Sequence, residues 1–293
     1  MPELPEVETT VRGLQKKVLK RTFIDVWSDW EKVVKKPEQF ETFRRLLKGR
    51  KILRIWRRAK NVIFELSGGH SLLIHQKMTG HLLVGKWRLA GRKWVSEQKG
   101  PFEEKINGFL HLILFLDNEQ MIALSDYRKF AKAELWKTEE LLSSPEFQAL
   151  GPEPLEKSFT YEVFKKRLQK KRGKIKQVLM NPLFVAGIGN IYASEALWRA
   201  KIHPERNSAT LSSQEGKELY RAIRTVLRAG IDLGGESFAD YRNVEGEKGR
   251  FDSKRKVYQR EGQPCSRCNV AIKRVMFGGR SAFYCPKCQP LEK

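Results

Sequence analysis

The four cysteines of this chain constrain its folding more than any other feature. They form two Cys-x2-Cys pairs near the C-terminal end, Cys265 with Cys268 and Cys285 with Cys288, and sixteen residues separate the pairs. Two tight turns with this spacing offer four thiolates to a tetrahedral zinc ion, and a site closed by four protein ligands is structural. The alternative is a pair of disulfides, which a reducing compartment disfavours.

The last thirty residues are too few to build a core of their own, so we expect one structural zinc ion to supply their folding energy. Between the two cysteine pairs, the run from Lys273 to Arg280 is basic and contains Gly278-Gly279. It predicts a basic hairpin with its tip near the two glycines, and such a hairpin suits contacts with phosphates.

The charge of the chain indicates a polyanionic partner. Lys and Arg number 57 against 34 Asp and Glu, a formal net charge of +23 over 293 residues. Such an excess predicts binding to nucleic acid or to an anionic membrane surface. No apolar run approaches the ~18 residues of a membrane span, and no secretory pattern opens the chain. We therefore expect a cytoplasmic protein that binds nucleic acid and no membrane; the alternative is a basic soluble protein without such a partner.

The N-terminus carries a candidate nucleophile. Residue 2 is a proline followed by Glu3, and a residue as small as Pro2 permits removal of Met1. An α-amino group has a pKa of roughly 7.7–8.0, so about a tenth of it is neutral at pH 7, far more than of a lysine near ~10.4. A secondary amine that attacks an aldehyde-level carbon yields an iminium, which makes the neighbouring carbon acidic. The alternative is that Pro2 and Pro5 only stiffen the entry to a helix.

Hydrophobic periodicity divides the chain into regions. Apolar residues at helical spacing predict an amphipathic helix at the start, and short β-rich runs from residue 23 to 135 predict a sandwich or barrel, interrupted by one helix at 37–47. Pro and Gly mark a linker at 143–155, and the period is helical again from 160 to 233. Residues 234–262 are glycine-rich and charged, and predict a loop with little core.

A basic run leads into a glycine pair in the helical region. Residues 165–176 hold eight bases and no acids, and Gly187 and Gly189 precede Asn190. Glycines that open a helix expose its N-terminal amides, which bind phosphate. The run and the amides together favour phosphate binding over the alternative of a solvated basic face.

Three further residues stand in turns beside bases. Lys60 ends an Arg-Arg-Ala-Lys turn between two predicted strands, where it would hold a phosphate, assist proton transfer or be merely solvated. Met78 and Phe130 each follow a predicted strand. An apolar side chain in such a place is either a wedge inserted into a base stack or ordinary core.

In combination, these motifs resemble one family. The N-terminal Pro-Glu-Leu-Pro-Glu-Val-Glu, the Arg-Arg-Ala-Lys turn, Gly-Pro-Glu-Pro-Leu, Gly-Ile-Gly-Asn-Ile-Tyr-Ala-Ser-Glu and the cysteine module follow one another in that order. Over essentially the whole chain they resemble bacterial formamidopyrimidine-DNA glycosylase. The resemblance implies an α+β fold: an N-terminal helix plus a two-layer β-sandwich, then an all-helical helix–two-turn–helix domain with a C-terminal β-hairpin zinc finger.

The resemblance also implies catalytic roles. Pro2 matches the Schiff-base nucleophile and Glu3 the acid/base. Lys60 matches a residue that assists β-elimination, and Arg280 one that assists δ-elimination and contacts phosphate. The resemblance further implies that release of the base and of both phosphates needs no redox cofactor and no catalytic metal.

Further positions match DNA contacts of the family. The residues that fill the void left by a flipped nucleotide are matched by Met78, Arg128 and Phe130, and Arg128 matches the contact to the opposite base. The phosphate contacts are matched by Lys171, Lys176, Asn190 and Tyr258. Residues 236–251 match a mobile loop that closes over the extruded base. Residues 86–105 depart from the usual pattern, with many bases and two tryptophans.

From this resemblance we predict five segments. They are a catalytic β-sandwich domain (1–137), a linker (138–159), a helix–two-turn–helix DNA-binding domain (160–235), a lesion-capping loop with a connector (236–262) and a zinc finger (263–293).

The predicted function is that of a bifunctional DNA glycosylase and apurinic/apyrimidinic (AP) lyase of base excision repair. It excises oxidised purines such as 8-oxoguanine and formamidopyrimidines from damaged double-stranded DNA, acting as a monomer on a flipped nucleotide. One alternative is the endonuclease VIII branch, which acts on oxidised pyrimidines; the Leu-Pro-Glu-Val start and the Met78–Phe130 pair favour the purine branch. The other is a non-enzymatic zinc-finger nucleic-acid-binding protein, which leaves Pro2 and Glu3 without a role.

Overall fold

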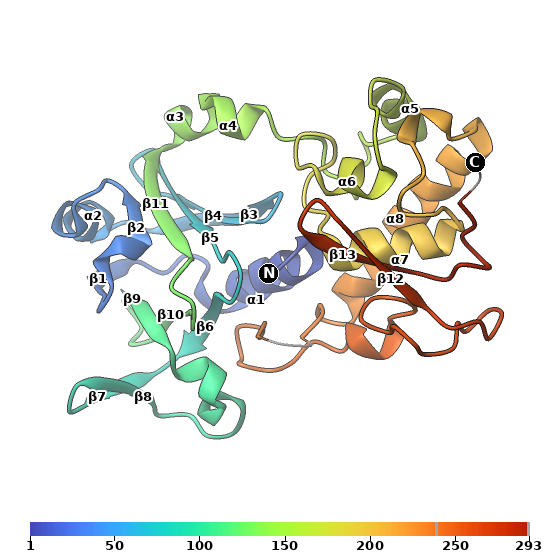
Figure 1. Ribbon diagram of the computed structural model, residues 1–293. Coiled ribbons are helices and arrows are strands. Elements are labelled where there is room, and N and C mark those ends of the chain that lie inside the picture. Colours follow the sequence, from blue (N-terminus) through green and yellow to red (C-terminus); the bar gives the residue numbers. More distant parts are fainter. Residues whose placement is uncertain (238–239, 292–293) are drawn as a thin grey trace. The chain divides into compact units, whose positions relative to one another are not determined.

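The computed structural model describes residues 1–237 and 240–291 and divides the chain into two compact units (Figure 1). The first unit comprises Met1–Gln148 and Leu233–Asp252, and the second comprises Ala149–Asp232 and Ser253–Lys293. Each unit is therefore built from two stretches of chain.

Two antiparallel-rich sheets form the first unit. The four-stranded sheet is antiparallel throughout, in the order β1 (Phe23–Trp27), β9 (Leu110–Leu116), β10 (Met121–Ser125), β6 (His81–Gly85). The five-stranded sheet has one parallel pair, β2 with β11, in the order β2 (Val34–Lys36), β11 (Lys132–Lys137), β5 (His70–His75), β4 (Asn61–Leu66), β3 (Ile52–Arg58).

One apolar core joins these sheets to two helices. Helix α1 (Leu4–Val18) contributes Val7, Val11 and Leu14, and α2 (Phe40–Leu47) contributes Phe43, all with 3% exposure or less. The predicted sandwich behind an N-terminal helix is therefore confirmed. Helix α2 begins three residues later than predicted, since strand β2 extends to Lys36 and Gln39, the N-cap position, is still extended.

Shorter elements complete the first unit. Among the described residues, strands β7 and β8 pair with each other and with no other strand, and they form a separate hairpin. The shorter elements of the first unit are η1 (Glu31–Val33), β7 (Trp87–Ala90), β8 (Lys93–Ser96), η2 (Gly100–Glu103), η3 (Lys105–Gly108), α3 (Thr138–Ser143) and α4 (Pro145–Gln148).

The described residues of the segment Leu233–Asp252, 233–237 and 240–252, contribute to the packing of the first unit, and the prediction of little core in this region is wrong. Tyr241, Val244 and Phe251 are each at most 5% exposed, and the carbonyl of Val244 accepts a hydrogen bond of 2.8 Å from the amide of Val84 in β6. These side chains follow no strand or helix period, so periodicity alone does not reveal their burial.

Helices dominate the second unit, which ends in a hairpin. Phe277 pairs with Arg280 across Gly278 and Gly279, and both glycines have positive φ (57° and 68°), so the predicted hairpin tip is confirmed. Among the described residues no helix is long and apolar enough to cross a membrane. The elements are α5 (Tyr161–Gln169), α6 (Ile175–Met180), α7 (Asn190–Ala200), η4 (Ser208–Thr210), α8 (Ser213–Asp232), η5 (Phe251–Lys254), β12 (Lys273–Phe277) and β13 (Arg280–Tyr284).

Candidate active site and nucleic-acid interface

The N-terminal turn is fixed by a buried carboxylate. Pro2 is buried and Glu3 is 2% exposed where α1 begins. Glu6 Oε2 accepts a hydrogen bond of 2.7 Å from the backbone N–H of Glu3, which completes a capping box, and its Oε1 accepts one of 2.7 Å from the N–H of Glu236. A single carboxylate thus joins the start of α1 to the segment Leu233–Asp252 and holds Pro2 and Glu3 in one conformation.

Burial at this turn favours a neutral amine. It lowers the pKa of the Met1 amino group below its usual value, with Glu3 and Glu6 acting in the opposite direction and Lys60 adding to the decrease. While Met1 is attached, the nitrogen of Pro2 is an amide and is not nucleophilic. Once Met1 is removed, the amine of Pro2 begins the same buried turn, where desolvation disfavours its charged form.

Lys60 lies close to this amine. As predicted, it stands in the turn between β3 and β4, where Ala59 has a φ of 53°. Arg57 anchors the turn on α1, because its buried guanidinium contacts Glu8 at 3.0 Å (Nε to Oε2) and also donates to the Ala59 carbonyl at 3.0 Å. Lys60 therefore lies in the first unit, near enough to the N-terminal amine to lower its pKa.

His75, at the end of β5, is a candidate active-site residue that the sequence patterns did not reveal. Its Nδ1 accepts a hydrogen bond of 2.9 Å from the backbone N–H of Lys77, and burial, with Lys77, Lys132 and Lys60 nearby, lowers its pKa to about 3. The imidazole is therefore neutral at physiological pH, and its Nε2 carries the proton. A lone histidine after an apolar strand has no motif around it that would have identified it.

Two locked turns carry the predicted wedge residues. Met78 is 41% exposed and Phe130 is 51% exposed, so both are too exposed for the core alternative. The buried carboxylate of Asp126 connects the turns, since it accepts hydrogen bonds from the Thr79 hydroxyl and, at 2.7 Å, from the Ala131 amide. The guanidinium of Arg128 lies 4.7 Å from the centre of the Phe130 ring.

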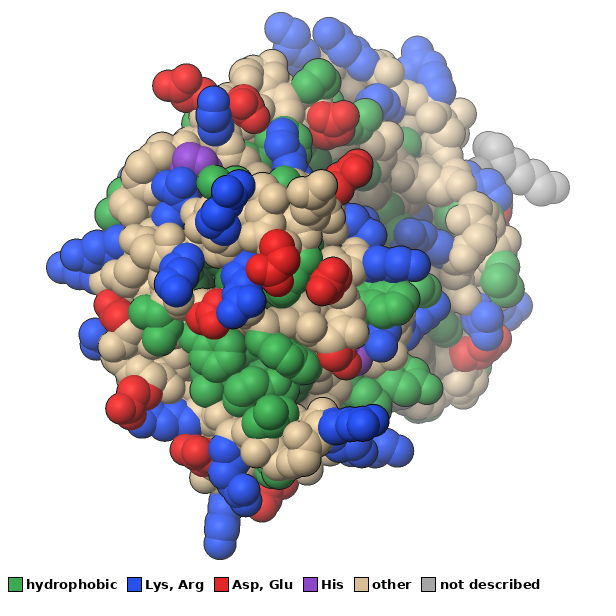
Figure 2. All heavy atoms as spheres, turned by 90° about the vertical axis from the view of Figure 1, so that its left-hand side faces the viewer, with side chains coloured by type: hydrophobic (Ala, Val, Ile, Leu, Met, Phe, Trp, Pro, Cys, Tyr) green, Lys and Arg blue, Asp and Glu red, His purple; other side chains and the backbone are tan. Residues whose placement is uncertain are grey.

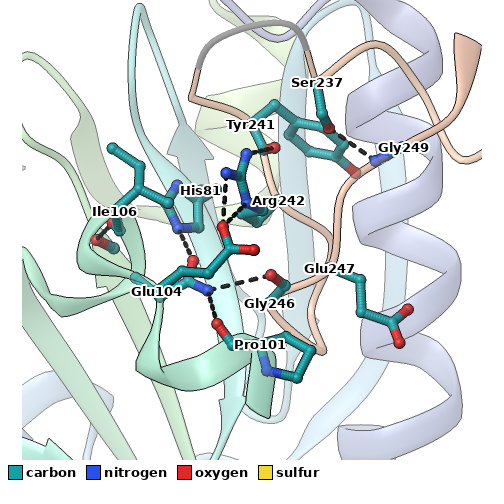
Figure 3. A network of polar contacts seen from close by, with 12 residues as sticks. His81, Pro101, Glu104, Ile106, Ser237, Tyr241, Arg242, Gly246, Glu247 and Gly249 are labelled. Carbon is teal, nitrogen blue, oxygen red and sulfur yellow. Dashed lines mark hydrogen bonds and ion pairs between the residues drawn. The ribbon is translucent and has the colours of Figure 1, made fainter. Parts of the chain in front are cut away.

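The segment Leu233–Asp252 is also anchored away from α1 (Figure 3). The guanidinium of Arg242 donates to Glu104 Oε2 from Nε at 2.9 Å and from Nη2 at 2.7 Å. The buried side chain of Asn107 donates to the Gly246 carbonyl at 3.1 Å, and its Oδ1 lies 2.8 Å from Nε2 of His81. Residues 104–107, which the sequence did not assign to any site, therefore hold the C-terminal half of this segment.

In the second unit, Asn190 and Tyr258 line one open pocket of about 350 Å³, which Arg274 and Ser281 also line. Asn190 is the first residue of α7, after Gly187 (φ 83°) and the N-cap Gly189, so helix amides begin there as predicted. The amide oxygen of Asn190 is buried and accepts no hydrogen bond from the residues described. This pocket combines hydroxyl groups and helix N–H groups with Arg274, which also faces the lining residue Glu261 at 4.0 Å, and its donors suit a phosphate.

A second pocket of about 170 Å³ unites Lys176 with Arg280 at the hairpin tip. Lys176 is 1% exposed and donates to the Ser281 carbonyl at 2.7 Å, whereas Arg280 is exposed. Lys176 is thus not part of a solvated basic face; its hydrogen bond to Ser281 holds strand β13 of the hairpin in place. Lys171 is half-buried directly after α5 and does not line this pocket.

Glu195 on α7 is another residue that the sequence patterns did not single out. Its carboxylate is buried and accepts backbone hydrogen bonds of 2.8–3.0 Å from Lys256, Val257 and Tyr258. Burial raises its pKa, although these three donors act in the opposite direction. Glu195 thereby fixes Tyr258 beside Asn190. The available signal was its position in Gly-Ile-Gly-Asn-Ile-Tyr-Ala-Ser-Glu, on an otherwise apolar stretch.

The four cysteine sulfurs converge as a metal site requires. All four Sγ atoms lie within 4.8 Å of one another, with neighbouring distances of 3.4 to 4.0 Å. Zinc–sulfur bonds of about 2.3 Å in a tetrahedron place sulfurs about 3.8 Å apart, whereas a disulfide needs about 2.05 Å. The thiols are free, so the geometry fits zinc and not disulfides. The module packs on α7, where Arg267 lies 3.8 Å from the Trp198 ring centre.

Comparison with known proteins agrees with this arrangement. Residues 1–133 match the sequence model of the formamidopyrimidine-DNA glycosylase N-terminal domain, residues 150–242 that of its H2TH domain, and residues 262–291 that of a zinc finger found in FPG and IleRS. The chain belongs to the formamidopyrimidine-DNA glycosylase family. The zinc-finger match confirms the predicted structural zinc ion.

Relatives of known name span the whole chain. The formamidopyrimidine-DNA glycosylases of Pelotomaculum thermopropionicum and Heliobacterium modesticaldum are each 40% identical to it, over 100% and 99% of this chain and 100% of their own. A Lactococcus lactis FPG mutant in complex with Fapy-dG DNA superposes with a TM-score of 0.87 at 32% identity, and the Lactococcus lactis enzyme with abasic-site DNA with 0.85 at 31%; both cover 99% of this chain and 100% of their own.

These matches confirm the α+β fold class and the enzyme class. The protein is a DNA glycosylase of base excision repair with AP lyase activity, and the reading as a purely DNA-binding zinc-finger protein is set aside. The two Lactococcus lactis structures are complexes with damaged DNA.

Proposed function

We propose that this glycosylase excises oxidised purines, formamidopyrimidines and 8-oxoguanine, from double-stranded DNA by means of the amine of Pro2. The observation that carries the proposal is the buried Pro2–Glu3 turn, capped by Glu6 and placed beside Lys60. Support for the substrate comes from solved relatives in complexes with DNA that contains Fapy-dG and carbocyclic 8-oxo-G.

The chemistry follows from an amine that is neutral when it meets the sugar. The Pro2 nitrogen bonds to C1′ as the bond between C1′ and the base breaks, and the base leaves with the proton that the amine releases. Opening of the sugar ring, with a proton passing from Glu3 to the ring oxygen, produces a cationic iminium. Loss of a proton from C2′ then expels the 3′ phosphate, and a second elimination expels the 5′ phosphate. Lys60 assists the first elimination and Arg280 the second.

The remaining site residues recognise DNA. Because C1′ is not accessible inside a duplex, the nucleotide must be extruded, at a cost of a few kcal/mol. Met78, Arg128 and Phe130, exposed on two turns that Asp126 locks together, occupy the vacated space, and Arg128 faces the opposite base. Phosphates bind at Lys171, Asn190 and Tyr258, while Lys176 acts through the hairpin that it supports. Residues 236–251, of which 238 and 239 lie outside the described residues, cover the extruded base.

The five predicted segments, the monomeric state and a cytoplasmic location belong to this proposal as well. The segment boundary that matters most is at residue 236, because Glu6 holds the amide of Glu236. A capping role for 236–251 therefore links base recognition directly to the turn that carries Pro2.

Two assays test this proposal. Borohydride should trap a covalent adduct between the protein and abasic-site DNA, because it reduces the iminium. Excision should be faster from an 8-oxoguanine duplex than from a thymine glycol duplex of the same sequence. Absence of an adduct would exclude the Pro2 mechanism, and a preference for thymine glycol would assign the chain to the endonuclease VIII branch.

A further inference from the structure

The outer face of the four-stranded sheet carries a second, separate group of apolar side chains. Leu83, Ile113 and Ala123 form its buried base, on the side of the sheet that does not contribute to the sandwich core. The β7–β8 hairpin adds Trp87, which is 4% exposed, and Trp94, which is partly buried. This hairpin lies in the stretch of sequence that departs from the family pattern, and nothing in the proposed chemistry uses it.

The exposed part of this group is continuous. Trp94 contacts Trp27 and Phe115 edge to face, with ring centres 5.6 and 5.7 Å apart. Phe115 pairs across the sheet with Met121, and Trp94 pairs across the hairpin with Leu89, which is 56% exposed. We call these five residues the outer apolar patch. Figure 2 looks onto this side of the first unit and shows a continuous hydrophobic surface among Lys, Arg and some acidic side chains.

Unpaired positive charge lies next to the patch. The hairpin carries Arg88, Arg92 and Lys93 and no acid, and none of the three forms an ion pair or hydrogen bond with any residue that the structure describes. Of the acids nearby, Asp25 is paired with Arg44 and Glu119 with Lys86, so exposed Glu97, directly after β8, stands against the three cations of the hairpin. The charge available to a partner is therefore positive.

We propose that the outer apolar patch and its three cations form a docking site for an acidic segment of another protein that carries apolar anchor residues. Such a segment would bury Leu89 and the aromatic edges while its carboxylates pair with the hairpin. A second copy of this chain is a poor occupant, because each copy carries a net charge of +23.

Two other anionic partners fit less well. Single-stranded DNA needs open ring faces for base stacking, whereas the edge-to-face contacts of Trp94 cover ring faces with ring edges, and the most exposed member of the patch is aliphatic. A membrane surface selects apolar side chains that project freely, whereas four of the five members are partly buried against the sheet.

Selection from a random twelve-residue peptide display library on the immobilised full-length protein tests the proposal. Enriched peptides should carry Asp or Glu around Leu, Phe or Trp. A fluorescein-labelled copy of the enriched peptide should lose about tenfold or more in affinity, measured by anisotropy, for Leu89→Ser and for the double variant Arg92→Ala/Lys93→Ala. Both substitutions are at exposed positions, so folding should be unaffected.

Matched controls make the result specific to this surface. Leu53→Ser removes an equally exposed leucine (53%) on β3, and Lys16→Ala/Lys35→Ala removes two exposed charges elsewhere in the same unit; both should keep wild-type peptide affinity. All variants should retain borohydride trapping, which separates this inference from the proposed catalysis. Enrichment without acidic residues, or equal loss in the controls, would overturn it. Binding of oligo-dT and of phosphatidylglycerol vesicles is measured for the same variants. The proposal would also be overturned if the patch and hairpin variants lost affinity for one of these probes but kept their affinity for the peptide.

Discussion

The two units of this protein use their buried polar groups in different ways. In the first, Glu6 and Asp126 accept hydrogen bonds from backbone and hydroxyl groups and fix turns on which the candidate nucleophile and the wedge residues stand. In the second, Glu195 and Lys176 support a helix start and a metal-stapled hairpin that present cations and amides. The comparison teaches that the proposed nucleophile and wedge residues depend on the first unit, whereas the proposed phosphate contacts and Arg280 depend on the second. Base displacement and phosphate binding should therefore be separable by substitution.

Pro2→Gly should have the largest effect, and only on chemistry. Glycine keeps a primary amine after Met1 removal but loses the secondary amine that forms a cationic iminium directly. Cleavage of 8-oxoguanine DNA should slow by roughly a hundredfold or more, which is about 2.7 kcal/mol of transition-state stabilisation. Single-turnover kinetics and gel-shift titration measure the two quantities. If affinity falls as much as the rate, the division between the units fails.

Cys268→Ser should reduce mainly DNA affinity, whereas Pro2→Gly reduces mainly the cleavage rate. Loss of one thiolate ligand should unfold the finger and displace Arg280, so DNA affinity falls while the first unit, with its own apolar core, stays folded. Zinc content by atomic absorption and circular dichroism of the β-rich unit test this. Retention of stoichiometric zinc with wild-type affinity would contradict a structural zinc site.

Phe130→Ala should separate steps within the first unit. Because Phe130 is half-exposed, its loss should change the melting temperature little, in the ±0.5 kcal/mol range of surface substitutions. It should slow excision from intact duplex yet leave cleavage at a preformed abasic site nearly unchanged, since no base remains to be extruded. Equal loss of both rates with a large fall in melting temperature would instead make Phe130 a core residue.

Glu104→Gln tests the anchor of the segment Leu233–Asp252. It removes the charge that faces Arg242; because Glu104 is itself 40% exposed and Gln keeps an acceptor oxygen, the loss of stability should be about 0.5–1.5 kcal/mol. If residues 236–251 cover the base, base excision should fall more than abasic-site cleavage. Glu140→Gln, which removes the exposed partner of Lys36, is the matched control and should be neutral. Equal effects of the two variants would count against the anchor.

Lys171→Ala should have the smallest effect and should act on affinity alone. Removal of one phosphate contact should lower the slope of log affinity against log salt by about one, equally for damaged and undamaged duplexes. Lys217→Ala on α8 is the control from the same unit. A slope that Lys171→Ala leaves unchanged would remove this residue from the phosphate contacts.

Local patterns in the sequence determined a large part of this protein. The cysteine spacing predicted the metal site, the glycine pair at 278–279 the hairpin tip, and the Arg-Arg-Ala-Lys run a turn between strands. These features depend on contacts between residues close in sequence, or on ligand spacing, so short windows suffice to recognise them. The N-terminal motif likewise indicated Pro2 and Glu3.

Only the tertiary structure decided how distant residues combine. Glu6 accepts a hydrogen bond from Glu236, 230 residues away, and buried Lys176 donates one to the Ser281 carbonyl. His75 is neutral because of burial and of lysines from other parts of the chain. The packing of Tyr241 and Val244 follows no helical or strand period either, and the outer apolar patch forms only where separate strands and the β7–β8 hairpin meet. The physical reason is that hydrogen-bond partners, desolvation and exposed surface are set by three-dimensional proximity, which sequence spacing does not encode.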